Sequence, residues 1–278
     1  MTELRRHEFG PPSAPTLLLL HGLTEAGTTW PNAVERWSAR WHIIAVDLRG
    51  HGASPRFAES DVVHTHEIWL ADVVEVLQQL PAPPIVVGHS LGALFALRAG
   101  VAAADLVRAL VLEDPARPSG EATPDPEFAA HQVSFLDTFA DGTAGEKARM
   151  RRVSAWSAAE IDAWADCKPL VDRRMIRDGL NLGPADRLTL LAALRVPTLF
   201  VVPEDGEMAP TDEELDNPLI EMARIPNVGH CVRRDDPAAY HAVVDPFLER
   251  NRPPMAGGKD VGPPTAPGAP PRSLRTSA

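Results

Sequence analysis

A glycine-flanked serine most constrains this chain. The sequence G-H-S-L-G at positions 88–92 follows an apolar run, Ile85–Val87, and opens a stretch of small, helix-favouring residues. The run has the length and composition of a strand buried on both faces. A very sharp turn needs glycine beside the serine, because larger side chains would clash there. The pattern therefore predicts a strand–turn–helix unit that holds the Ser90 hydroxyl at the carboxyl end of a buried strand.

Similar short apolar runs recur along the chain and are separated by helical patterns. The clearest helical pattern covers His66–Leu80, where apolar residues recur at helical spacing. Alternation of strands and helices predicts βαβ units and a parallel sheet. The expected strands are Thr16–Leu20, His42–Val46, Ile85–Val87, Ala109–Leu112, Pro197–Val202 and Leu219–Ile225, and a helix over Pro237–Arg250 is expected to close the domain.

The strand signal stops between Pro115 and Asp186, where the sequence is polar and helical. Within this stretch, Ser157–Glu160 has the pattern of a capping box and predicts the start of a helix. We therefore expect a core domain from residues 1–114 and 187–250, with a helical cap over 115–186. Residues 251–278 are rich in proline and glycine and almost devoid of apolar side chains, which predicts a disordered tail.

Composition excludes several classes of function. The formal net charge of the 278 residues is −11, and an acidic chain repels the phosphates of nucleic acids. Its two cysteines, Cys167 and Cys231, make neither a disulfide framework nor a zinc site, and free thiols suit a reducing compartment. The apolar runs are too short to span a membrane, and the charged N-terminus is no signal peptide. We expect a cytoplasmic protein without a metal, nucleic-acid or membrane partner.

Two further segments are candidates for chemistry. His230 follows the last expected strand, and an imidazole with a pKa of about 6.5 can accept the serine proton near neutrality. The turn His21-Gly22-Leu23 ends the first strand at the same sheet edge. The amides of Leu23 and Leu91 are therefore the expected donors to an oxyanion.

The glycine-rich loop 47–54 is interpreted as structural. An aspartate that opens such a turn usually accepts backbone N–H bonds, so Asp47 is predicted to brace the loop. His51 is expected to be a brace or a surface residue, and His21 to be structural rather than catalytic.

These motifs, in this order from Pro15 to Arg250, resemble the serine-nucleophile branch of the α/β-hydrolase superfamily. The resemblance implies an α/β fold, with a mostly parallel, doubly wound sheet and a helical cap inserted after the strand that ends near Leu112. It also implies hydrolysis without a cofactor, through an acyl-enzyme on Ser90 with His230 as general base.

The acid of the triad departs from the pattern of the family. Most members carry an aspartate three residues past a glycine after the strand that is here Pro197–Val202. In this chain Pro203 replaces that glycine, and Asp205 comes one residue early. A second branch has its acid after the strand that precedes the cap, where Asp114 stands. Both aspartates remain candidates, with a slight preference for Asp114, while Glu113 and Glu207 are less favoured.

The resemblance favours a carboxylic ester or a lactone as the small-molecule substrate. Alternatives on the same residues are cleavage of an amide or a carbon–carbon bond, a perhydrolase, a cofactor-free haloperoxidase, or a receptor-like binder. Haloalkane dehalogenase and epoxide hydrolase are disfavoured, because those relatives have an aspartate where this chain has Ser90. Among the aromatic residues of the cap, Phe135, Phe139 and Trp156 are expected to contact the substrate.

Overall fold

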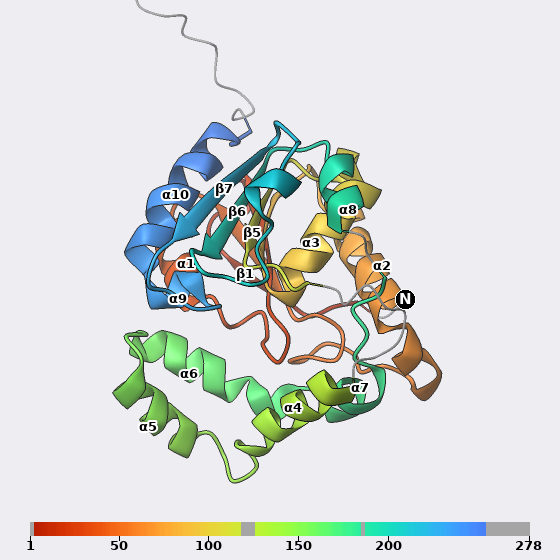
Figure 1. Cartoon of the computed structure of the whole chain (residues 1–278), viewed down its shortest axis with the longest axis vertical. Coiled ribbons are helices and arrows are strands. Elements are labelled where there is room, and N and C mark those ends of the chain that lie inside the picture. Colours follow the sequence, from red (N-terminus) through yellow and green to blue (C-terminus); the bar gives the residue numbers. More distant parts are fainter. Residues whose placement is uncertain (1–2, 118–125, 185–186, 254–278) are drawn as a thin grey trace, which may run out of the picture.

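A seven-stranded sheet forms the centre of the molecule, as a computed structural model shows for residues 3–117, 126–184 and 187–253 (Figure 1). The strands follow the order β1-β3-β2-β4-β5-β6-β7, and every neighbouring pair is parallel except β1 with β3. The expected mostly parallel sheet is thereby confirmed. The strands are β1 (Arg6–Phe9), β2 (Thr16–Leu20), β3 (His42–Val46), β4 (Ile85–His89), β5 (Ala109–Glu113), β6 (Thr198–Pro203) and β7 (Ile220–Ile225).

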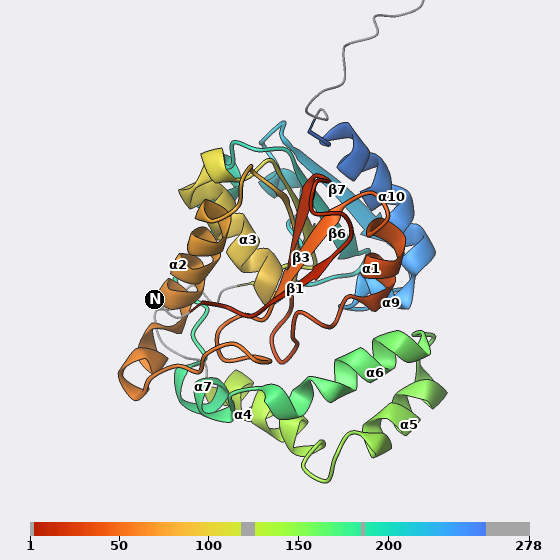
Figure 2. The same ribbon diagram turned by 180° about the vertical axis from the view of Figure 1, so that it is seen from behind.

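Each face of the sheet is covered by helices (Figures 1 and 2). Successive side chains of a strand point to opposite faces, so Leu18 and Leu20 of β2 enter one core while Leu17 and Leu19 enter the other. The first core lies under α2 (Thr65–Gln78), α3 (Leu91–Ala102) and α8 (Arg187–Ala193). The second lies under α1 (Pro31–Trp37), α9 (Val232–Asp235) and α10 (Pro237–Arg250).

A group of helices gathers beyond the carboxyl ends of the parallel strands (Figures 1 and 2). The segment consists of α4 (Pro126–Asp137), α5 (Ala144–Val153), α6 (Ala158–Asp166), η3 (Lys168–Leu170) and α7 (Arg173–Gly179). We call residues 126–184, which contain these helices, the cap. The remaining short helices are η1 (Glu59–His64), η2 (Ala104–Leu106) and η4 (Asp212–Glu214). Within the described ranges, no helix combines the length and the hydrophobicity that crossing a bilayer requires.

The structure differs from the sequence-based expectations at both ends. Strand β1 was not expected, since its four residues are half-buried or exposed and form no apolar run. Asn251 and Arg252, assigned to the disordered tail, are held in place: the Asn251 amide donates to Phe247 O, and the Arg252 guanidinium to Arg40 O. The predicted tail from residue 254 onward lies outside the described residues.

Candidate active site

The serine turn has the strained backbone that its sequence predicts. Ser90 joins β4 to α3 with φ 51° and ψ −112°, a conformation that non-glycine residues rarely adopt. The flanking glycines allow close backbone contacts. A Cβ on Gly88 would lie 2.6 Å from the backbone of Ala93, and one on Gly92 would lie 2.1 Å from Leu20 O. The sheet and α3 therefore hold Ser90 at the end of β4.

His230 is paired with an aspartate from another strand end. Asp114, directly after β5 and with φ 36°, lies with Oδ2 2.6 Å from His230 Nδ1. The carboxylate is buried, whereas 42% of the His230 side chain is exposed. Because Nδ1 is bound to Asp114, Nε2 is the ring nitrogen left to exchange a proton. The other oxygen, Oδ1, is buried and accepts no hydrogen bond from the described residues, which distinguishes Asp114 from a loop brace.

The other acidic candidates lie elsewhere. Asp205 is exposed in the loop after β6, and among the described contacts no hydrogen bond joins it to His230. Glu113 is fully buried and binds the guanidinium of Arg233 at 2.7 Å. Glu207 is exposed. Of the four candidates, the structure brings Asp114 alone into contact with the imidazole.

Ser90 and His230 line one cavity of about 490 Å³ beneath the cap. Leu23 lines it as well, and Leu91 begins α3 directly after the serine. In the described part of the chain, neither the Leu23 nor the Leu91 amide donates a hydrogen bond to another protein group. Two unpaired amides beside the serine could bind an oxyanion.

The cap residues that line this cavity differ from the predicted ones. Phe135, Phe139 and Trp156 do not line it; they pack around Trp164 inside the cap, with Trp156 and Trp164 centroids 6.0 Å apart. Helical spacing marks an apolar face but does not reveal whether that face meets the cavity or the interior of the cap. The cap residues that line the cavity are Phe128, Gln132, Trp164, Lys168, Leu180, Asn181 and Leu182.

The loop after β3 is structural, as predicted. The Asp47 carboxylate accepts hydrogen bonds from the amides of Gly27 and Ala53 at 2.7 and 2.8 Å. Burial alone would raise the pKa of Asp47, but hydrogen bonds from His7 and those amides lower it to about 2. His51 is buried rather than on the surface; burial and the neighbouring His21 lower its pKa to about 3. His21 braces the same loop by accepting the Leu48 amide at 2.9 Å.

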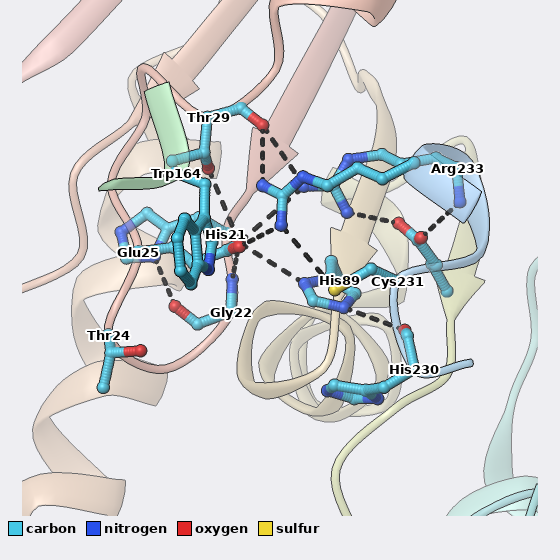
Figure 3. A network of polar contacts seen from close by, with 12 residues as sticks. His21, Gly22, Thr24, Glu25, Thr29, His89, Trp164, His230, Cys231 and Arg233 are labelled. Carbon is cyan, nitrogen blue, oxygen red and sulfur yellow. Dashed lines mark hydrogen bonds and ion pairs between the residues drawn. The ribbon is translucent and has the colours of Figure 1, made fainter. Parts of the chain in front are cut away.

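A buried ion network, which the sequence did not reveal, lies beside the site, and Figure 3 shows part of it. Arg234 lies 2.5 Å from Glu25 and 2.9 Å from Glu160 of the cap, while Arg233 binds Glu113. The only hint of this network in the sequence is the pair of arginines shortly after His230. Such a pair cannot be told from arginines on a protein surface by sequence alone. We call Glu25, Glu113, Glu160, Arg233, Arg234 and His89 the ion network.

His89 links the ion network to the His230 loop. Its Nδ1 lies 3.4 Å from Glu25 Oε2, and its Nε2 lies 3.2 Å from His230 O (Figure 3). Burial alone would lower the pKa of His89, but Glu113, Cys231 and Glu25 outweigh burial and raise it to about 10. A protonated His89 forms an ion pair with Glu25 through Nδ1 and donates from Nε2 to His230 O, which fixes the backbone of His230.

The cap also contacts the loop of His230 directly. The Trp156 indole donates to Asp235 Oδ1 at 2.7 Å, and the Gly229 amide donates to Asp235 Oδ2 at 2.7 Å. One carboxylate therefore joins a cap residue to the turn that carries His230.

Comparison with known proteins places this site in context. A family described as "Alpha/beta hydrolase family" matches residues 17–243. An N-formylmaleamate deformylase of Pseudomonas putida is 27% identical over 84% of this chain and 88% of its own length. A pimeloyl-[acyl-carrier protein] methyl ester esterase of Methylococcus capsulatus is 30% identical over 66% of each chain. Matches to three other curated relatives span 39% to 42% of the relatives' own lengths.

The fold is similar to that of solved structures. The crystal structure of an N-formylmaleamic acid deformylase from Pseudomonas putida superposes with a TM-score of 0.69, at 23% identity, over 87% of this chain and 96% of the other. At this identity the likeness concerns the fold.

Proposed function

The chain belongs to the alpha/beta hydrolase family, and on that premise we propose that it is a serine hydrolase that cleaves a carboxylic ester or lactone through an acyl-enzyme on Ser90. The observation that carries the proposal is the hydrogen bond from His230 Nδ1 to buried Asp114, in a cavity shared with the strained serine. An aspartate–imidazole pair beside a serine can generate a nucleophile near neutral pH without a metal.

The proposed reaction proceeds in two steps. Ser90 Oγ attacks the carbonyl carbon while His230 Nε2 accepts its proton, and the amides of Leu23 and Leu91 stabilise the oxyanion. The imidazolium then protonates the departing alkoxide, leaving an ester on Ser90. Water, deprotonated by His230, attacks this ester and releases the acid, and the serine recovers its proton. Asp114 orients the imidazole and stabilises its positive charge in both steps.

A second candidate is the hydrolysis of an amide, such as an N-formyl group. It is favoured by the likeness to N-formylmaleamate deformylase over most of both chains. The same residues would serve, with His230 protonating a departing nitrogen instead of an oxygen.

The test is hydrolysis of p-nitrophenyl esters of increasing acyl length by the wild type and by Ser90→Ala. We expect turnover by the wild type, no turnover by Ser90→Ala, and an acyl adduct on the peptide that contains Ser90 after rapid acid quenching. Equal turnover by both proteins would refute the role of Ser90. If neither protein cleaves esters while the wild type alone cleaves N-formyl amides, the second candidate replaces the first.

A further inference from the structure

A lysine of the cap lies buried against the cavity. Lys168 opens η3, is 3% exposed, and lines the same cavity as Ser90 and His230. Its Nζ donates to Thr24 O at 2.9 Å and lies 5.1 Å from the centre of the Trp164 ring. Lys168 therefore joins the cap to the loop after β2, one residue beyond the Leu23 amide.

The charge of Lys168 has no anionic partner. Among the described residues, no aspartate or glutamate oxygen lies within 4 Å of its Nζ. Glu25 also lines the cavity but is bound by Arg234.

The neighbouring ion network is balanced without this lysine. The three carboxylates of Glu25, Glu113 and Glu160 face the two guanidinium groups of Arg233 and Arg234 and the protonated ring of His89, so three negative charges meet three positive ones. Asp114 is engaged with His230. Neither the ion network nor Asp114 therefore leaves a carboxylate free to pair with Lys168.

A buried cation without an anion is costly, because a carbonyl and an aromatic face replace only part of its hydration. An ammonium has three donors; Thr24 O takes one, and a second faces the weak acceptor Cys167 Sγ at 3.9 Å. An anionic group in the cavity would supply the missing charge. One ammonium matches the single charge of a carboxylate better than the charge of nearly two on a phosphate monoester.

We propose that Lys168 binds a carboxylate of the substrate, so that the compound cleaved at Ser90 carries a second, ionised carboxyl group. This inference rests on the proposed function and specifies its substrate class. Arg117 also lines the cavity but is exposed, so solvent screens its charge and Lys168 is the buried cation that needs a partner.

The first test compares mono-p-nitrophenyl adipate, whose remote carboxyl group is ionised, with its methyl ester, in which that group is neutral. The wild type should prefer the acid in kcat/KM. In Lys168→Met the ratio of the two kcat/KM values should fall by about 10- to 100-fold, mainly through the KM of the acid. Lys168→Arg should retain part of the preference. Lys147→Met is the matched control, because Lys147 is ion-paired on the outside of the cap with Asp166, and its ratio should not change.

An unchanged ratio in Lys168→Met would overturn the proposal, as would a wild type that prefers the methyl ester. If melting shows that Lys168→Met is unfolded, Lys168→Gln, which keeps a donor for Thr24 O, replaces it under the same criteria.

A second test does not depend on turnover. Calorimetric titration of Ser90→Ala with monomethyl adipate should show binding that the added Lys168→Met change weakens by about 10-fold or more, with dimethyl adipate binding weakly to both. Absent binding of monomethyl adipate, or tighter binding of inorganic phosphate, would overturn the carboxylate assignment. Failure of the proposed function itself would show separately, as hydrolysis by Ser90→Ala at the wild-type rate.

Discussion

Glu160, on the cap helix α6, lies with Oε2 2.9 Å from Nε of Arg234, which stands four residues after His230. Both side chains are buried, and the second oxygen of Glu160 accepts the Asn32 amide at 3.2 Å. The capping box that the sequence predicts is therefore only half formed: Ser157 Oγ accepts the Glu160 amide, but the Glu160 side chain turns to the core domain. The cap is tied by a charge pair to the segment that carries the proposed base.

Breaking this pair should destabilise the protein strongly. Glu160→Gln leaves the buried guanidinium of Arg234 with one carboxylate partner, Glu25, and removal of one member of a buried pair costs about 3–5 kcal/mol. Urea unfolding should show a loss of this size. Glu146→Gln is the control, because its partner Arg149 is 45% exposed, and we expect a change under about 1 kcal/mol. Similar losses in both variants would contradict the role of burial.

Substituting each candidate aspartate by asparagine should show, through the effect on kcat, which of the two is the acid of the triad. Asp114→Asn should lower kcat by about three to four orders of magnitude, because the amide no longer orients the imidazole or stabilises its charge. Asp205→Asn, in the exposed loop after β6, should retain kcat within about twofold of wild type. The measurement is kcat on the best p-nitrophenyl ester. A greater loss in Asp205→Asn would reassign the acid.

His89 should make stability depend on alkaline pH. Its pKa is raised from 6.5 to about 10 in the folded protein. The contribution of His89 to the free energy of unfolding is therefore complete below pH 6.5, where His89 is protonated in the unfolded chain as well. This contribution is lost as the pH rises toward 10. Urea unfolding between pH 6 and pH 10 should show a decline in the wild type that is shallower in His89→Gln. Parallel curves would mean that His89 is neutral when folded.

The serine turn should not tolerate alanine at Gly92. The added Cβ would lie 2.1 Å from Leu20 O, a backbone atom of the central sheet that cannot move aside cheaply. We expect Gly92→Ala to lose more than about 2 kcal/mol of stability and most activity. Gly145→Ala, where nothing lies within 4 Å of the new methyl group on α5, should be neutral or stabilising by about 0.5–1 kcal/mol. Thermal melting and ester hydrolysis of both variants would decide.

Buried strands were predictable because their signal is local. Thr16–Leu20 and His42–Val46 form strands with the expected bounds, since continuous apolar runs need burial on both faces. Strand β1 has no such run, because it pairs at the sheet edge. The serine turn was predictable for a related reason: the strained backbone at Ser90 requires glycine on both sides, and this requirement is local in the sequence.

Contacts between distant segments were not predictable to the same degree. Asp114 and Asp205 both follow strands at the same sheet edge, and only the tertiary geometry brings one of them to His230. Lys168 and Arg234 carry the sequence signal of ordinary surface residues, and their burial depends on how the cap meets the sheet.

The Asp235 carboxylate accepts one hydrogen bond from Trp156 of the cap and another from the Gly229 amide beside His230. This double use limits how freely caps can be exchanged between relatives. A cap grafted from another hydrolase would need an indole or equivalent donor for Asp235. Without it, one oxygen loses its partner and the turn before His230 loses part of its support. Chimeras that respect only the boundaries of the cap would therefore alter the loop of the proposed base, His230, along with the specificity they set out to change.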